Sequence, residues 1–422
     1  MAGFIFELGS QTDASGFAAG DTLYFKDAAP TDVGVAFTPA SGLSTATVTL
    51  NVGTQSLTFA ADALGAAAAI TFISADGELV IGTSGADGAL ATASDDDSAV
   101  WGLAGADGIS LDGDGNHIAH GGDGGDTIDV EAGSTGVLNI FGEGGNDTVT
   151  NAAGATGGAL NIYGGLGADT LAGSDTNDHI YGNVAAPSGT VADSADSITA
   201  GDGNDYVNGN AGADTIDGED GSDRIFGGAD GDSIDGSAGN DTVNGNKGDD
   251  TISGGDDNDS LRGGADDDSI TGDAGNDIIQ GDLGDDNITG GAGADIMTGG
   301  AGADVFVFDV TDAAVLTVGS AKFYDTITDY VVGEDTLDFS TNATLPTDVL
   351  YVTGATFQTV AAATTAAQTA LTAGDDGDLV AVAVGTDTYL FFDADANDGT
   401  IDSVIKLSGI ADASTITIDD FV

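Results

Sequence analysis

Residues 245–262 read GNKGDDTIS-GGDDNDSLR, and they are two of twelve consecutive nine-residue blocks that fill residues 200–307. Every block has Asp at its sixth position and an apolar residue at its eighth, and the first four positions are rich in glycine. An apolar spacing of nine fits neither the 3.6-residue period of a helix nor a heptad. Each block is therefore predicted to form a sharp turn followed by a short strand.

The sixth-position aspartates offer hard oxygen ligands. Glycines let the chain reverse within a few residues and present carbonyl oxygens on the inside of the bend. Calcium prefers six to eight such oxygens, whereas zinc prefers Cys and His, and this chain has no Cys and three His. We therefore predict multiple Ca²⁺ sites. The predicted metal ligands of the regular blocks are Asp205, Asp214, Asp223, Asp232, Asp241, Asp250, Asp259, Asp268, Asp277, Asp286, Asp295 and Asp304.

The block resembles the calcium-binding nonapeptide of the RTX family. The resemblance implies an all-β fold, a right-handed parallel β-roll or β-helix solenoid in which two blocks make one coil turn and bound calcium lies between block i and block i+2. Asp205 would then share an ion with the turn that carries Asp223, and Asp214 with the turn that carries Asp232. The eighth-position side chains would stack as two inward columns.

Residues 81–199 contain degenerate and interrupted blocks. Their sixth slots add five predicted metal ligands, Asp107, Asp126, Asp147, Asp169 and Asp178. Between the blocks lie Val130 to Phe141, Asn151 to Tyr163 and Gly182 to Thr190, which are interpreted as extra coil edges or surface loops. One solenoid over about residues 82–307 is the economical model.

The flanking segments lack the nonamer. Residues 1–80 carry β-branched and aromatic runs such as Phe4-Ile5-Phe6 and Ala46 to Leu50, which predict a small β-rich domain. Residues 308–422 are predicted to form a β-rich cap, with one short helix at Ala361 to Leu371. The Asp393 to Asn397 run departs from an EF-hand at its sixth and twelfth places, so a hairpin turn is preferred there.

The segments Asp325 to Tyr330, Gly333 to Phe339 and Tyr389 to Asp395 resemble the region that follows the repeats in serralysin-type proteases. The start of the chain has no secretory signal peptide. The final Ile418 to Val422 pairs acidic residues with terminal hydrophobic residues, as do the uncleaved signals of type I secretion. The resemblance therefore implies export by that route to an extracellular place, the cell surface or the biofilm matrix.

The charge balance is extreme: six basic residues stand against 71 acidic ones, a formal net charge of −65. Nucleic acid is excluded as a direct partner, and no stretch is long enough to span a bilayer. Such self-repulsion opposes compaction. Without calcium, a disordered polyanion is the favoured state. Because ligands that bind only the folded state stabilise it, calcium is predicted to act as a folding switch.

Catalytic motifs are missing from the sequence. There is no H-E-x-x-H and no G-x-S-x-G, which argues against the protease and lipase activities found in the family. Paired carboxylates are too numerous here to indicate glycosidase chemistry. We expect no enzyme activity.

The two faces of the predicted solenoid differ. Even-numbered blocks place Thr, Ser, Asn and Asp at the outward positions seven and nine. Odd-numbered blocks instead place there Tyr206, Arg224, Phe226, Arg262, Ile278 and Ile296. A mixture of arginine, aromatic and aliphatic groups on a flat sheet is typical of a contact surface, and packing against the protein's own caps is the alternative.

The sequence thus predicts a secreted calcium-binding structural protein that self-assembles, as a homo-oligomeric lattice (S-layer) or a filament of the biofilm matrix. Its first strand, Phe4-Ile5-Phe6, is one candidate for pairing with a neighbouring copy. The alternative is a monomeric calcium-dependent adhesin that binds a surface polysaccharide. A third interpretation takes the Ser/Thr-rich even face as an ice-binding surface, although Asp217 and Asp235 interrupt its ladder.

Overall fold

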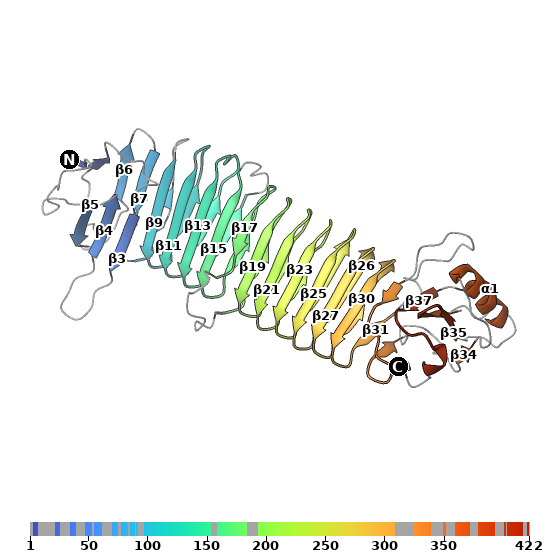
Figure 1. Ribbon diagram of the computed structural model, residues 1–422. Coiled ribbons are helices and arrows are strands. Elements are labelled where there is room, and N and C mark those ends of the chain that lie inside the picture. The colour runs from blue at the N-terminus through green and yellow to red at the C-terminus, as the bar shows by residue number, and fades with distance from the viewer. Residues whose placement is uncertain are drawn as a thin grey trace. The chain divides into compact units, whose positions relative to one another are not determined.

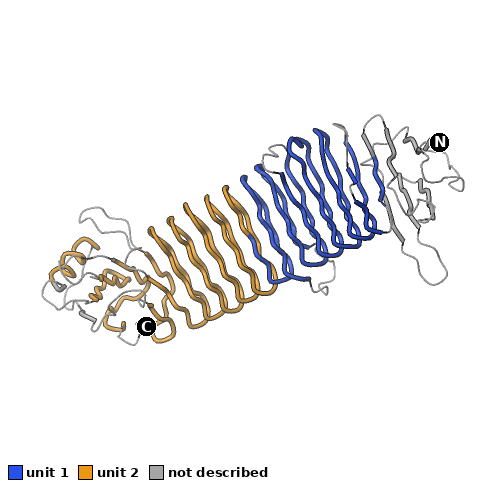
Figure 2. Tube along the Cα trace, turned by 180° about the vertical axis from the view of Figure 1, so that it is seen from behind, with its two compact units in different colours: residues 1–216 blue, residues 217–422 orange. Residues whose placement is uncertain are grey.

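The computed structural model describes residues 97–152, 158–183, 193–308, 325–338, 359–371, 379–392, 401, 403–416 and 420–421. It also describes residues 82 and 85–88, together with the strands before residue 92 and at 349–351. The chain forms two compact units, residues 1–216 and 217–422 (Figure 2). Both contain a parallel β-solenoid, in which successive strands of one sheet are separated along the chain by a strand of the other (Figure 1). The predicted all-β solenoid is confirmed.

In unit 1, one sheet presents a column of aromatic residues outward and is called the aromatic sheet; the other is called the threonine sheet. The aromatic sheet contains β9 (Ser98–Ala104), β11 (His117–Asp123), β13 (Leu138–Gly144), β15 (Leu160–Leu166), β17 (His179–Tyr181) and β19 (Tyr206–Ala211). The threonine sheet contains β8 (Leu90–Ala91), β10 (Gly108–Leu111), β12 (Thr127–Val130), β14 (Thr148–Asn151), β16 (Thr170–Ala172), β18 (Ser197–Thr199) and β20 (Thr215–Asp217).

The coil turns of unit 1 vary in length. Equivalent aspartates lie 18 to 27 residues apart, because loops of different length join the strands. Leu138 to Phe141 and Leu160 to Tyr163 were expected within coil edges or loops, and that expectation is wrong. They form strands β13 and β15, where Leu138, Ile140, Leu160 and Ile162 alternate with outward residues and are buried. Apolar residues at every second position therefore form a strand even where the nine-residue pattern is lost.

In the regular blocks of unit 2 the equivalent aspartates lie 18 residues apart, so two blocks make one coil turn. Odd-numbered blocks supply one sheet and even-numbered blocks the other, as predicted. The odd-block sheet contains β21 (Arg224–Ala229), β23 (Thr242–Lys247), β25 (Ser260–Ala265), β27 (Ile278–Leu283), β30 (Ile296–Ala301) and β32 (Asp325–Ile327). The even-block sheet contains β22 (Ser233–Asp235), β24 (Thr251–Asp256), β26 (Ser269–Gly275), β28 (Asn287–Thr289), β31 (Val305–Val307) and β33 (Thr336–Asp338), with β29 (Ala292–Gly293) beside β26.

The eighth-position residues form the solenoid core in both units, as predicted. They are paired in register from turn to turn, for example Val243 with Leu261 and Ile252 with Ile270. Each is at most 3% exposed. The set is Val207, Ile216, Ile225, Ile234, Val243, Ile252, Leu261, Ile270, Ile279, Ile288, Met297 and Phe306.

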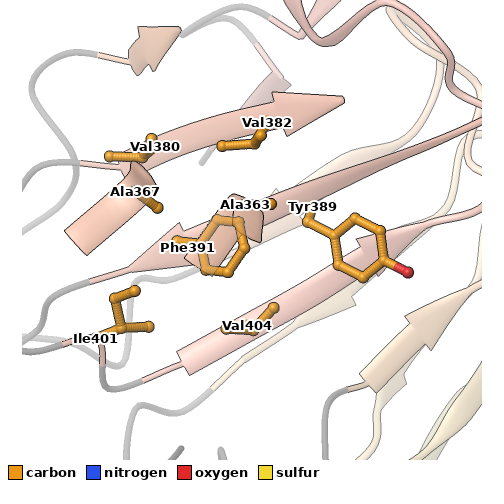
Figure 3. Packing of buried hydrophobic residues seen from close by; sticks show 8 residues of the cluster. All are labelled: Ala363, Ala367, Val380, Val382, Tyr389, Phe391, Ile401 and Val404. Atoms are coloured by element: carbon orange, nitrogen blue, oxygen red, sulfur yellow. The ribbon is translucent and has the colours of Figure 1, made fainter. Parts of the chain in front are cut away.

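The end of unit 2 has a separate hydrophobic cluster, shown in Figure 3. Helix α1 (Val360–Leu371) packs Ala363 and Ala367 against β35 (Leu379–Val384), which pairs antiparallel with β36 (Asp387–Phe392). β36 in turn pairs antiparallel with β37 (Ser403–Leu407), and β34 (Val349–Tyr351) lies beside β35. The predicted helix and β-rich cap are confirmed here.

Two smaller elements complete this end. A 3₁₀ turn, η4 (Ala413–Thr415), is capped by Asp412. Phe421 forms a β-bridge with Leu337, and the Gly333 amide donates to Asp420 Oδ1 at 3.1 Å. The Asp393 to Asn397 run lies outside the described residues.

The N-terminal strands confirm the β-rich prediction for residues 1–80. β1 (Gly3–Phe6) pairs parallel with β2 (Thr22–Phe25). β3 (Gly34–Thr38), β4 (Thr47–Val52) and β5 (Gln55–Ala60) form an antiparallel sheet, and β6 (Ile70–Ser74) pairs with β7 (Gly77–Ile81). Among the described residues, no helix has the length and apolar character needed to cross a membrane.

Candidate calcium centre

Each predicted sixth-position aspartate lies at the end of a turn, immediately before the strand. All seventeen are buried, with at most 3% of any residue exposed. Burial of so many carboxylates is costly unless each is paired, protonated or bound to a cation. The partners of the two carboxylate oxygens therefore decide what these turns can hold.

One oxygen of the carboxylate is used to join consecutive coil turns. The Asp241 amide donates to Asp259 Oδ1 at 2.8 Å, and the Asp259 amide donates to Asp277 Oδ1 at 2.8 Å. The same bond links Asp232 to Asp250 and Asp250 to Asp268 on the other edge of unit 2. Blocks i and i+2 are thus stacked, as the family resemblance implied. The pairs Asp205 with Asp223 and Asp214 with Asp232 join residues of the two units and stay predictions.

The other oxygen is buried and accepts no hydrogen bond from the protein. This holds for Oδ2 of eleven turn aspartates, Asp107, Asp126, Asp147, Asp169, Asp196, Asp241, Asp250, Asp259, Asp268, Asp277 and Asp286. A buried anionic oxygen without a donor is expensive, so a cation or a proton must satisfy it.

A glycine at the first position of the block, as at Gly254, keeps the space beside this oxygen open. A Cβ on Gly254 would lie 2.5 Å from Asp259 Oδ2 and 2.8 Å from the carbonyl oxygen of Gly272 in the next coil turn. The turn therefore brings a carboxylate oxygen and a backbone carbonyl oxygen to one small space that only glycine leaves free. Such donors fit a hard cation, and calcium in particular, because calcium accepts many oxygen ligands in a flexible geometry.

Burial also changes the acidity of these groups. Desolvation, with a smaller contribution from neighbouring carboxylates, raises the pKa of Asp259, Asp268 and Asp277 to about 7. The amide bond to Oδ1 acts in the opposite direction. In the metal-free coil these carboxylates therefore bind protons near neutral pH. A bound cation would keep them ionised, so calcium and protons compete for the same groups.

The carboxylates do not gather in clusters. In the described part of the chain, no group of three or more His, Cys, Asp or Glu side chains is placed to hold one metal ion. A cation in these turns would therefore depend mainly on backbone carbonyl oxygens, with single carboxylates from successive turns. This explains why glycine, which shapes the backbone, recurs as regularly as the aspartate.

Three further aspartates occupy the same structural place and were not among the predicted ligands. The Asp169 amide donates to Asp196 Oδ1 at 2.8 Å, the Asp295 amide to Asp325 Oδ1 at 3.0 Å and the Asp304 amide to Asp335 Oδ1 at 3.1 Å. Each precedes a buried aliphatic residue by two positions, Ile198, Ile327 or Leu337. That short Asp-x-aliphatic pattern is present in the sequence, but the usual glycines are missing before Asp196 and Asp325, and Asp335 has only Gly333.

Asp178 is brought into the row but differs from the others. The Asp178 amide donates to Asp205 Oδ1 at 2.6 Å, as in a regular turn. Its own Oδ2, however, accepts hydrogen bonds from the Ser174 amide at 2.6 Å and the Ser174 hydroxyl at 2.9 Å. The carboxylate is thus satisfied by the protein itself.

Comparison with known proteins agrees with this geometry. The family model described as RTX calcium-binding nonapeptide repeat (4 copies) matches residues 139–156, 161–184 and, in overlapping segments, 192–306. RTX nonapeptide repeats bind calcium ions and are typical of secreted proteins. No curated protein shows a matching sequence.

Solved structures with similarity include two repeat subunits of a mannuronan C5-epimerase from Azotobacter vinelandii. AlgE6R3 is 28% identical, covers 40% of this chain and 78% of its own, and has a TM-score of 0.28. AlgE6R2 is 26% identical, covers 41% and 90%, and has a TM-score of 0.27. The extracellular lipase LipA from Serratia marcescens is 15% identical, covers 66% and 44%, and has a TM-score of 0.25.

The buried aspartate rows, the glycine-shaped turns and the matched segments lead to one conclusion: over residues 139–156, 161–184 and 192–306, the β-solenoid is built from RTX calcium-binding nonapeptide repeats.

Proposed function

We propose that the protein is a secreted, calcium-loaded structural protein that assembles with copies of itself into an extracellular lattice or filament. The sixth-position aspartates other than Asp178 hold the calcium ions, type I secretion exports the chain, and no catalytic role is assigned. Nearly all described residues belong to the solenoid or to its β-rich flanks, which suits a scaffold.

The observation that carries self-assembly is the outward face of the odd-block sheet. Its seventh and ninth positions from block three onward contain no carboxylate, although the chain has 71 acidic residues. Ile278 and Ile296 are register partners there and are 49% and 45% exposed. Leu283, at the end of the same strand as Ile278, is 60% exposed. A sheet face that carries exposed isoleucines and no carboxylate at these positions is where two copies of a polyanion can approach with the least repulsion.

Strand addition through β1 is a weaker route to assembly. β1 already pairs with β2 of the same chain over residues 3–6 and 22–25. We therefore place the contact between copies on the odd-block sheet.

The test is a pair of double variants, Ile278→Asp with Ile296→Asp and, as control, Ser269→Asp with Asn287→Asp. The control residues are register partners on the even-block sheet, so they add the same charge to the other face. In millimolar calcium we expect the wild type and the control to form assemblies by light scattering and negative-stain microscopy, and the first variant to remain monomeric with an unchanged circular dichroism spectrum. A wild type that stays monomeric at every concentration would refute the proposal.

A second candidate, a calcium-dependent adhesin for a neutral polysaccharide, is favoured by the outward face of the aromatic sheet. Trp101, His120, Phe141, Tyr163 and Tyr181 stack in a column with centroid distances of 3.6, 4.6, 5.0 and 5.0 Å. The neighbouring column includes Asn139 and Asn161, joined by a side-chain hydrogen bond of 3.1 Å. Aromatic ring edges beside side-chain amides can pack against the sugar rings of a neutral polysaccharide and form hydrogen bonds with its hydroxyl groups.

Affinity electrophoresis in gels containing a neutral polysaccharide distinguishes this candidate. Retardation that needs calcium and is lost in Phe141→Ala with Tyr163→Ala would support the adhesin. Equal mobility with and without neutral polysaccharides would leave the column with a purely structural role.

A further inference from the structure

The turn at residues 173–178 differs from the regular turns in the hydrogen bonds that its aspartate accepts. Asp178 Oδ2 receives two hydrogen bonds from Ser174, from the amide at 2.6 Å and from the hydroxyl at 2.9 Å. The hydroxyl is itself held by Thr176, whose Oγ1 lies 3.0 Å away. Ser174 and Asp178 are both buried, 4% and 1% exposed. Donors of the protein therefore occupy the space that stays open beside the aspartate of a regular turn.

Serine at the second position does not by itself produce this arrangement. Ser237 occupies the same slot in the block of Asp241, but its backbone is left-handed, with φ of 70°. Its amide donates to Asp235 Oδ1 and its hydroxyl to Asp217 Oδ1, both away from the turn. Asp241 Oδ2 then accepts no hydrogen bond. The two blocks can therefore be compared directly. Ser174 donates hydrogen bonds to the aspartate of its own turn, whereas Ser237 does not.

The position of Asp178 in its row gives a physical reason. In a regular turn, Oδ1 accepts from the amide of an aspartate in the preceding coil turn. Asp178 Oδ1 instead accepts from the Leu160 amide at 2.7 Å, so the preceding coil turn brings no carboxylate to this edge. Asp178 is therefore the first aspartate of its row, and the row continues from it to Asp205.

We infer that the turn at residues 173–178 binds no cation, and that Ser174 is a built-in cap that ends this row of calcium sites. A row of shared ions must end somewhere, and the last carboxylate would otherwise be left buried and half-satisfied. Two neutral donors remove that cost without a metal. This inference rests on the proposed ligand role of the sixth-position aspartates and is independent of self-assembly.

The experiment counts calcium ions per full-length chain by native mass spectrometry, with circular dichroism as the check of folding. We expect Asp178→Asn to leave the count unchanged, and Asp241→Asn to lower it by at least one. Opening the cap in Ser174→Gly should raise the count by one, whereas the matched Ser237→Gly should not change it. The serine variants report on the cap even if Asp178→Asn folds poorly.

Two results would overturn the inference: a count that falls in Asp178→Asn as it does in Asp241→Asn, or one that stays the same in Ser174→Gly. If Asp241→Asn also leaves the count unchanged, the aspartates are not the ligands and the inference fails with them. Assembly in microscopy has no bearing on these outcomes, so failure of the structural proposal is seen separately.

Discussion

Asp259 illustrates what a single turn aspartate does. Its Oδ1 accepts the Asp241 amide and joins two coil turns, while its Oδ2 accepts no hydrogen bond and lies beside the open space kept by Gly254. The side chain thus both joins two coil turns by a hydrogen bond and is a candidate calcium ligand. Replacing it removes both roles, which is why the neighbouring glycine gives the cleaner test of the cation.

At the residue scale, we predict that Gly254→Ala weakens calcium-dependent folding. The added Cβ would lie 2.5 Å from Asp259 Oδ2 and 2.8 Å from the Gly272 carbonyl oxygen, so one of these groups must move. We expect a loss of about 1–3 kcal/mol in the free energy of unfolding in calcium and a higher calcium midpoint by circular dichroism. Gly85→Ala is the control, because nothing lies within 4 Å of its Cβ position. Equal midpoints for the two variants would contradict the role given to Gly254.

Calcium affinity should also depend on pH. Burial raises the pKa of Asp259, Asp268 and Asp277 to about 7, above the value of about 3.9 expected in an unfolded chain. The calcium-free fold therefore binds protons more tightly than the unfolded chain. That contribution to stability is complete below about pH 4 and is lost as pH rises through about 7.

Calcium needs these carboxylates ionised, so its effect has the opposite sign. We expect the calcium midpoint to rise as pH falls from 8 to 6, and the calcium-free chain to gain β-structure as pH falls from 7 to 4. Calcium titrations at three pH values and an acid titration in chelator, both followed by circular dichroism, measure the two effects. A midpoint independent of pH would show that protons and calcium do not compete.

At the scale of the element, each strand is short, and its stability comes from the column of eighth-position residues it joins. Ile270 is fully buried and pairs in register with Ile252 and Ile288. Ile278, which begins strand β27, is 49% exposed on the outer face. The same residue type thus has two different roles, decided by whether its side chain points inward or outward.

We predict that Ile270→Ala costs about 2–5 kcal/mol of unfolding free energy, through lost burial and the cavity left behind. Ile278→Ala should change it by at most about 0.5 kcal/mol, as for ordinary surface positions. Urea denaturation in millimolar calcium compares the two. A large effect at Ile278 in dilute monomer would mean that the odd-block face is covered by the protein itself.

At the scale of the whole molecule, the net charge of −65 sets the conditions for folding. Repulsion among carboxylates favours an expanded chain, and bound cations would both neutralise the turns and coordinate the carboxylate oxygens that accept no hydrogen bond. We predict that the hydrodynamic radius in chelator falls sharply on addition of calcium. Sodium chloride at matched ionic strength should have a smaller effect, because it only screens. Dynamic light scattering provides the measurement, and equal compaction by sodium would argue against specific sites.

The two units should differ in chelator. Unit 1 contains the aromatic column and the Ser174 turn, neither of which needs a cation. Residues 217–307 of unit 2 consist of regular blocks. Hydrogen exchange in chelator should therefore show slower amides at residues 160–181 than at residues 242–289. Uniformly fast exchange would indicate that the whole coil depends on calcium.

The sequence by itself determined the periodic part of this protein. The nine-residue period predicts a turn, an aspartate ligand and a short strand with an apolar residue in every block, because backbone reversal and oxygen ligands are local properties. The resemblance of these blocks to RTX repeats in turn implied the solenoid, its core and the opposite faces of odd and even blocks.

Only the tertiary structure decided what lies beside each aspartate. Asp196 and Asp325 join the rows although no glycine of the repeat precedes them, and Asp335 joins with Gly333 alone. They stack on partners 27 to 31 residues away in the sequence. Leu138 and Leu160 lie in strands, not loops, because the coil accepts turns of unequal length. Ser174 and Ser237 occupy the same position of their blocks, yet only Ser174 donates a hydrogen bond to the aspartate of its own turn. Such choices depend on the neighbouring coil turn, and its contacts are set by the packing of distant residues.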